Sequence, residues 1–99
     1  MPELLAEEGI EAALRSLPGW RGDARALERT ATLPDFATAI AVVDEVAAVA
    51  EELDHHPDVD IRWRTLRFAL STHVAGGVTE RDVELARRIE EVIARHGTR

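Results

Sequence analysis

Five residue types are missing from the 99-residue chain: lysine, tyrosine, cysteine, asparagine and glutamine. Their absence excludes a Schiff-base lysine, a thiolate nucleophile and a phenolic acid as catalytic groups. A phosphate-binding loop that ends in lysine is excluded as well, and neither Ser16 nor Ser71 lies in a nucleophile-elbow pattern. Histidine, aspartate and glutamate remain, so an enzyme with this sequence is expected to transfer protons.

Positive charge is also scarce, because 12 basic residues against 19 acidic ones give a net charge of -7. The arginines are dispersed, so the sequence predicts no direct contact with nucleic acid. The longest mostly apolar run, residues 36–50, is interrupted by Asp44 and Glu45 and is too short and polar to span a membrane. The N-terminus is acidic where a secretory signal is basic, and the chain lacks cysteine, so we expect a cytoplasmic protein.

The composition is typical of one folded domain. Hydrophobic residues make up 45% of the chain and charged residues 31%, which fits a globular protein and not a disordered one. A chain of this length holds a single hydrophobic core. We therefore expect residues 1–99 to form one domain.

Three segments have the apolar spacing of amphipathic helices: residues 3–17, 35–54 and 80–94. Asp35 is a good N-cap for the second helix, which must end before Pro57 because proline and the residue before it disfavour helical geometry. Thr79 and Asp82 resemble a capping box for the third helix, with Asp in place of the usual Glu. Gly97 is a plausible end for that helix.

Three further segments are typical of strands. Residues 20–33 predict a hairpin with a turn at Gly22 and Asp23. Residues 59–63 and 66–71 alternate between apolar and polar with a parity shift, which indicates a second hairpin that turns near Arg64. The order α-β-β-α-β-β-α predicts an α+β fold, in which a four-stranded antiparallel sheet has three helices packed on one face. The other face of the sheet is then open to water, a ligand or another subunit.

The chemistry-bearing residues gather where the second helix ends. His55 and His56 follow that helix, Glu51 lies one turn before His55, and His73 follows the last strand. If that strand lies beside the helix end, three imidazoles and a carboxylate converge. Histidine titrates near neutrality, which suits general acid and base catalysis with one ring in each role. We expect Asp82 to hold a ring nitrogen of His73.

A structural explanation fits each of these residues taken alone. A histidine at a helix C-terminus is favoured by the helix dipole, and Asp82 has a capping role in any case. Trp20 and Trp63 are typical core anchors, and His96, alone at the end of the last helix, is expected to be structural. Zinc is a further alternative, but the chain has neither an HExxH motif nor a zinc-finger spacing, so the sequence predicts no metal site.

Two stretches, AEELDHHPDVDIRW and LSTHVAGGVTERDVELA, resemble the signature of the pterin-4a-carbinolamine dehydratases. That signature has an acid, three residues, His-His-Pro, a later aromatic, Thr-His, a Gly-containing turn and an Asp that opens the last helix. The matching positions are Glu51, His55, His56, Pro57, Trp63, Thr72, His73, Gly77 and Asp82. The segments PGW at 18–20 and DFATAIAVVDEVAAVAEE from Asp35 are also similar to the family. Two positions differ, because Val59 stands where the family often has an aromatic residue and Trp63 where it has tyrosine.

The resemblance implies a hydro-lyase that dehydrates a 4a-hydroxytetrahydropterin, the 4a-carbinolamine, to a quinonoid dihydropterin in tetrahydrobiopterin recycling. It implies catalytic roles for His55, His56 and His73, without saying which ring is the acid and which the base. It implies supporting or substrate-binding roles for Glu51, Pro57, Thr72, Asp82 and Trp63. It also implies no metal and no bound cofactor, since the pterin is the substrate.

The resemblance leaves a second function open, because members of this family also act as dimerisation partners of a transcription factor or as assembly factors. The alternative is therefore a non-enzymatic partner protein with the same fold. The open sheet edge and the amphipathic helices predict a homodimer or homotetramer in either case. A pure scaffold has no need of three histidines with supporting acids, which favours the enzyme.

Overall fold

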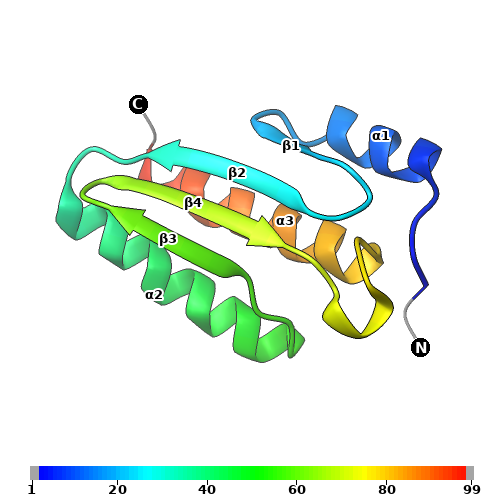
Figure 1. Ribbon diagram of the computed structural model, residues 1–99. Helices are drawn as coiled ribbons and strands as arrows, with labels where there is room; N and C mark the ends of the chain where they lie inside the picture. Colours follow the sequence, from blue (N-terminus) through cyan, green and yellow to red (C-terminus); the bar gives the residue numbers. More distant parts are fainter. Residues whose placement is uncertain (1–2, 98–99) are drawn as a thin grey trace.

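The helices and strands follow one another in the predicted order. The computed structural model describes residues 3–97, and Figure 1 shows how its elements are arranged. In chain order they are α1 (Glu7–Arg15), β1 (Trp20–Gly22), β2 (Leu27–Thr32), α2 (Phe36–Leu53), β3 (Asp58–Arg62), β4 (Thr65–Leu70), the short 3₁₀ helix η1 (His73–Ala75) and α3 (Glu80–His96). Within residues 3–97 this is the predicted α+β fold with a four-stranded antiparallel sheet. The predicted domain over residues 1–99 also includes residues 1, 2, 98 and 99, which lie outside the described part.

Two antiparallel hairpins build the sheet, whose strand order is β1-β2-β4-β3. The pairing of β2 with β4 joins the hairpins, with Leu27 opposite Leu70 and Ala31 opposite Leu66. Directly opposite residues share a face in an antiparallel pair, so these side chains point to the same side of the sheet. β1 and β3 are left at the two edges.

Helices α2 and α3 cover one face of the sheet, and the hydrophobic core lies between these two layers (Figure 1). α1 lies beside β1 and adds Ile10 to that core. The largest fully buried side chains are Phe68, Leu27, Leu33, Leu66, Leu70, Leu85, Ile89, Ile93, Val42, Val46, Val78 and Val83. Full burial of each large apolar side chain contributes about 1.5–3 kcal/mol to stability, so this layer fixes the helices that carry the candidate site.

The first helix is shorter than the sequence predicts, because α1 begins at Glu7 and not at residue 3. The amide of Leu5 donates a hydrogen bond of 3.0 Å to the carbonyl of Val78, and Leu4 forms an isolated bridge with Thr79. These residues are therefore extended along the segment that precedes α3. Their backbone groups pair with a distant part of the chain, which the apolar spacing of residues 3–17 does not reveal.

The end of α2 has a geometry that orients the two adjacent histidines. Asp35 caps its start, as predicted, by accepting a 2.7 Å hydrogen bond from the amide of Thr38. At the other end Asp54 adopts a left-handed conformation with φ 51°, and the amide of His55 bonds the carbonyl of Ala50 at 3.0 Å. The chain therefore leaves the helix abruptly, and His55 follows the turn immediately.

Within residues 3–97, no helix is long and apolar enough to cross a membrane.

Ion pairs join the exposed sides of α2 and α3. Arg88 makes two hydrogen bonds of 3.0 and 3.1 Å to the carboxylate of Glu52. Arg95 and His96 both contact the carboxylate of Glu45, and their hydrogen bonds, that from Arg95 above all, hold its pKa below the usual value. His96 thus links two helices, which agrees with the structural role expected for it.

Candidate functional site

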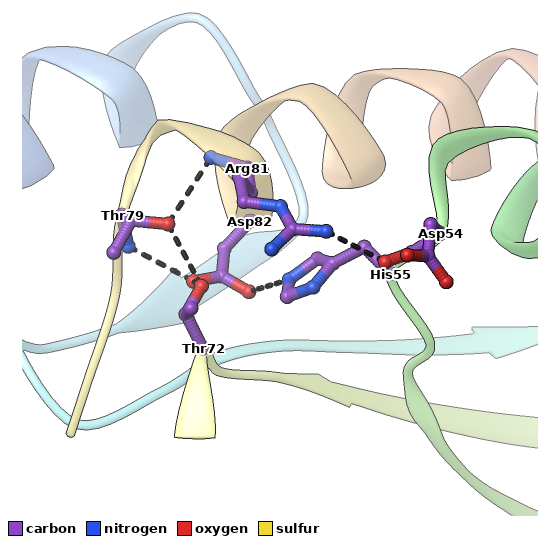
Figure 2. A network of polar contacts seen from close by, with 6 residues as sticks. All are labelled: Asp54, His55, Thr72, Thr79, Arg81 and Asp82. Carbon is purple, nitrogen blue, oxygen red and sulfur yellow. Dashed lines mark hydrogen bonds and ion pairs between the residues drawn. The ribbon is translucent and has the colours of Figure 1, made fainter. Parts of the chain in front are cut away.

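His55 is held by a buried carboxylate. Its Nε2 lies 2.6 Å from Oδ1 of Asp82, and the two residues are only 8% and 0% exposed. Figure 2 shows the imidazole directed at this carboxylate from the end of α2, while Asp82 comes from the first turn of α3. With Asp82 ionised, Nε2 carries the proton of the hydrogen bond, so Nδ1 is the nitrogen left to accept or donate a proton.

The second carboxylate oxygen of Asp82 is hydrogen-bonded as well. Its Oδ2 accepts hydrogen bonds from the Thr72 hydroxyl at 2.8 Å and from the amide of Thr79 at 2.9 Å. The Thr72 and Thr79 hydroxyls are 2.7 Å apart, and the capping box predicted from Thr79 and Asp82 is present. One carboxylate therefore caps α3 and fixes the ring of His55, so its position is set by three donors.

The predicted contact between Asp82 and His73 is wrong, since Asp82 holds His55 instead. Leu70 and Thr72 are buried while His73 is exposed, as the two-residue period of extended chain requires. Thr72 consequently points toward the carboxylate, and His73 opens the 3₁₀ helix η1 on the outside. No hydrogen bond joins the His73 ring to another residue of the described part.

His56 has a carboxylate partner of its own, but in a different environment. Its Nε2 lies 2.6 Å from Oε2 of Glu51, one helical turn back on α2. The side chains of His56 and Glu51 are 57% and 77% exposed, so water screens this pair far more than the pair of His55 and Asp82. The two adjacent histidines are therefore each paired with an acid, one inside the protein and one at its surface.

The three histidines border one cavity of about 220 Å³. Its lining residues are Asp54, His55, His56, Ser71, Thr72, His73, Val74 and Arg81. The structure thus brings the three predicted histidines and Thr72 together, with Asp82 directly behind His55. The cavity is smaller than the roughly 300–1,000 Å³ typical of ligand pockets, so a ligand here would be small or only partly enclosed.

A second, apolar groove of about 380 Å³ adjoins this cavity between α2 and β3. It is lined by Val43, Val46, Ala47, Ala50, Glu51, His56, Pro57 and Val59. His56 borders both hollows, whereas Glu51 and Pro57 border only the groove. The predicted supporting residues are therefore divided between two neighbouring surfaces.

Trp63 lies far from the other predicted site residues. It occupies the first position of the two-residue turn between β3 and β4, with φ 54°, and it is 88% exposed. Pro57 precedes the other end of β3, roughly 20 Å away for an extended chain that rises about 3.3 Å per residue. Trp63 lines neither the histidine cavity nor the groove of its own chain.

Arg81 is a site residue that the sequence reasoning missed. Its guanidinium donates a 2.6 Å hydrogen bond to the carbonyl of Asp54, and its amide donates to the Thr79 hydroxyl at 3.2 Å (Figure 2). It thereby ties the left-handed end of α2 to the start of α3, on either side of His55. The only local signal was its position beside Asp82, because its partner lies 27 residues earlier in the sequence.

The arrangement supports proton transfer. It offers two imidazoles whose Nε2 atoms are occupied by carboxylates and a third, exposed imidazole at the same cavity. Such rings can act as acid and base near neutral pH. No group of three or more histidine, aspartate or glutamate side chains within residues 3–97 is placed to hold a metal ion.

Known proteins resemble this chain over nearly its full length. The family model described as pterin 4 alpha carbinolamine dehydratase matches residues 3–92. A relative from Nocardia farcinica is 53% identical over 91% of this chain and 95% of its own length, and one from Mycolicibacterium smegmatis is 50% identical over 92% and 97%. Both carry provisional names as pterin-4-alpha-carbinolamine dehydratases.

Solved structures agree with these matches. A Brucella melitensis protein, described as a transcriptional coactivator/pterin dehydratase, has a TM-score of 0.86 and 35% identity over 94% of this chain and 98% of its own. A pterin dehydratase-like protein, described as a RuBisCO assembly factor in the alpha-carboxysome, has a TM-score of 0.61 over 74% of this chain and 84% of its own, at 22% identity, and so shares the fold alone. The family match, the identity of the relatives and the shared fold lead to one conclusion: this chain belongs to the pterin-4a-carbinolamine dehydratase family.

Proposed function

We propose that the protein is a hydro-lyase that converts a 4a-hydroxytetrahydropterin to the quinonoid dihydropterin during tetrahydropterin recycling. The observation that carries this proposal is the meeting of His55, His56 and His73 at one cavity. The family to which the chain belongs supports the reaction class. The net reaction needs only proton transfer, which these residue types can supply.

In the proposed reaction the bond between C4a and the hydroxyl oxygen breaks, and the oxygen takes a proton from one imidazolium to leave as water. The proton on N5 passes to a neutral imidazole, and the electron pair of that N–H bond forms the new double bond between N5 and C4a. Each proton transfer by a positioned histidine is worth about 10²–10⁴ in rate. The acid and the base both come from His55, His56 and His73.

The other residues of the site have supporting roles in this proposal. Asp82 fixes the tautomer of His55 and stabilises its cationic form, because the carboxylate is buried and faces the ring at 2.6 Å. Glu51 does the same for His56 at the surface. Thr72 orients Asp82 through its hydroxyl, and Pro57 restricts the backbone after His56.

The proposal is tested by stopped-flow measurement of carbinolamine dehydration with His55→Ala and His73→Ala. Loss of one proton-transfer group is expected to lower the rate at least about tenfold in each variant. His96→Ala is the matched control, because His96 contacts Glu45 away from the cavity and its removal leaves the three rings in place. Wild-type turnover in both site variants would contradict the assignment.

A second candidate function is that of a non-enzymatic binding or assembly partner. It is favoured by the Brucella melitensis structure, whose description combines a transcriptional coactivator with a pterin dehydratase. This function requires a protein surface and no histidine chemistry. A wild-type protein that fails to accelerate dehydration would therefore favour it over the enzyme.

A further inference from the structure

Helix α1 is the least buried of the three α-helices. Figure 1 shows it beside β1 at the edge of the molecule, whereas α2 and α3 form the layer on the sheet. Of its nine residues only Ile10 is buried. A helix of that length is not stable alone in water and depends on its packing. The contacts of α1 within its own chain are therefore few for the helix that they have to hold.

A groove lies between α1 and the turn that joins β1 to β2, and we call it the α1 groove. Its volume is about 440 Å³, and its lining residues are Glu7, Ile10, Glu11, Leu14, Gly22, Asp23, Ala24 and Arg25. The four residues from α1 recur at steps of three and four, which is the spacing of one helix face. The volume lies within the roughly 300–1,000 Å³ of typical ligand sites, so side chains of another molecule can enter.

The floor of the α1 groove is apolar. Ile10 is 3% exposed and Leu14 is half-buried, and on the other side Gly22 and Ala24 carry no long side chain. Gly22 must remain glycine, because a Cβ there would lie 2.2 Å from the carbonyl oxygen of Ala26. A second helix can therefore approach α1 closely, as it must, since packed helix axes lie about 8–10 Å apart.

Negative charge dominates the rim of the α1 groove. Asp23 pairs with Arg25 at 3.7 Å, so these two charges cancel. Glu7 and Glu11 are both exposed, and among residues 3–97 neither carboxylate has an ion pair or a side-chain hydrogen bond. They lie one turn apart on the same helix face, where like charges repel each other and destabilise the helix. A cation between them would remove this repulsion, so the rim selects a basic partner.

We propose that the α1 groove binds a basic amphipathic helix of another protein. Apolar side chains of that helix cover Ile10 and Leu14, and its arginine or lysine side chains pair with Glu7 and Glu11. In this kind of recognition, apolar anchors at steps of three and four lie in a groove and complementary charges fix the partner. The α1 groove shares no lining residue with the histidine cavity, so the interaction does not rest on the proposed reaction.

A second copy of this chain offers no helix with these properties. α1 itself has three glutamates and one arginine, and α2 has no basic residue at all. α3 does carry arginines, but its apolar face is buried in the core of its own chain. The occupant that fits the charge of the rim and the apolar floor is therefore a helix from a different protein.

Fluorescence anisotropy with a synthetic peptide tests the proposal. The probe is a labelled peptide of about 16 residues, long enough to form a helix in water, with leucines on one face and arginines beside them. We expect saturable binding to the wild-type protein that weakens as salt is added, because salt screens exposed charges. A peptide with glutamate in place of each arginine should not bind. No binding of the arginine peptide, or equal binding of both peptides, would overturn the proposal.

Two variants separate the charge of the α1 groove from its shape. Glu7→Gln combined with Glu11→Gln keeps the size of both side chains and removes both charges. We expect the dissociation constant of the arginine peptide to rise about 2- to 30-fold, since each exposed ion pair is weak. Ala24→Trp fills the groove from an exposed position and should abolish saturable binding. Circular dichroism checks that both variants are folded, and unchanged binding to both would overturn the proposal.

The matched control is Glu3→Gln combined with Glu8→Gln. It makes the same change in net charge at the same end of the chain, but neither residue lines the α1 groove. The peptide should bind this control as it binds the wild type. A control that weakens binding as much as the change at Glu7 and Glu11 would show attraction to net charge alone and would overturn the proposal.

Amide hydrogen exchange locates the bound peptide. With one buried residue, α1 should exchange faster than α3, which has seven. A saturating amount of peptide should slow the exchange of α1 and leave that of α3 unchanged. Protection elsewhere, with α1 unaffected, would overturn the proposal. None of these measurements requires dehydratase activity, so failure of the proposed function would not be mistaken for failure of this interface.

Discussion

Asp82 combines two roles in one side chain. It is fully buried, it completes the capping box of α3, and it bonds Nε2 of His55 at 2.6 Å. A carboxylate so placed must accept several hydrogen bonds, because an unpaired buried charge is strongly unfavourable. The same contacts that satisfy it also fix the ring of His55, so stability and the proposed catalysis are coupled at this residue.

Asp82→Asn is expected to impair both properties. If the amide nitrogen replaces Oδ2, it faces the hydroxyl of Thr72 and the amide of Thr79, and if it replaces Oδ1, it faces Nε2 of His55. All three groups donate hydrogen bonds to the carboxylate, and an amide nitrogen cannot accept them. We expect the free energy of unfolding, measured in urea, to fall by about 1–3 kcal/mol. We also expect the dehydration rate to fall about 10²-fold or more. Glu84→Gln, an exposed change on the same helix, is the control and should alter neither. A variant with full activity would show that Asp82 only caps α3.

At the scale of elements, the loop that carries His73 depends on a close backbone contact. Thr72 and Gly77 form a bridge, and the amide of Thr72 bonds the carbonyl of Gly77 at 2.9 Å. A Cβ at position 77 would lie 2.5 Å from the carbonyl oxygen of Ala24. Only glycine fits here, so this position determines the path of the chain from η1 to α3.

Gly77→Ala should therefore shift η1 and destabilise the protein. We expect the free energy of unfolding, measured by heat or urea, to fall by at least about 1 kcal/mol. The carbonyl oxygen of Ala24 belongs to the backbone and cannot move aside as a flexible side chain can. Dehydration should slow as His73 and Thr72 move from the cavity. Gly9→Ala is the matched control, since a Cβ there meets only Leu5 at 3.8 Å and alanine stabilises helices by roughly 0.5–1 kcal/mol relative to glycine. Equal stability of the two variants would contradict this explanation.

Glu90 links α3 to the first hairpin, β1 and β2, through side-chain hydrogen bonds. Its carboxylate accepts hydrogen bonds from Arg29 at 2.9 and 3.1 Å and from the indole of Trp20 at 2.7 Å. Partial burial tends to raise the pKa of Glu90, but the bonds from Arg29 and Trp20 outweigh it and hold the pKa below its usual value. The interaction thus favours the ionised carboxylate in the folded protein.

Glu90→Gln should remove a pH-dependent part of the stability. Because the folded protein has the lowered pKa, this contribution is present above the ordinary glutamate pKa of 4.5 and is lost as the pH falls through the folded value. We expect the free energy of unfolding of the variant to be about 1–3 kcal/mol lower than that of the wild type at neutral pH. In acid the two free energies should differ less. Urea unfolding at several pH values measures this difference, with the exposed Glu91→Gln as control. A constant difference at all pH values would contradict the role of the charge.

Across the whole molecule, the parts set by local chemistry could be predicted. The N-cap at Asp35, the break at Pro57 and the capping box of α3 depend on residues close together in the sequence, and the structure has all three. The four-stranded antiparallel sheet followed from two hairpins that must share a core, whereas its strand order was not predicted. The start of α1 could not be predicted, because Leu4 and Leu5 pair with Thr79 and Val78.

The candidate site was only partly predictable for the same reason. The histidines meet at one cavity, but the choice of His55 over His73 as the partner of Asp82 depends on the left-handed turn at Asp54 and the packing of α2 on α3. Strand alternation after Leu70 already indicated that Thr72 would point inward and His73 outward. The position of Trp63 follows from the length of β3, which separates it from the histidines of its own chain.

The most direct test of the whole account is the rate of carbinolamine dehydration by the wild-type protein and by a variant with His55→Ala, His56→Ala and His73→Ala together. The histidine cavity predicts acceleration by the wild type and a return to the rate in buffer for the triple variant, with the folded circular dichroism spectrum kept in both. Acceleration that survives the loss of all three imidazoles would contradict the claim that they carry the reaction.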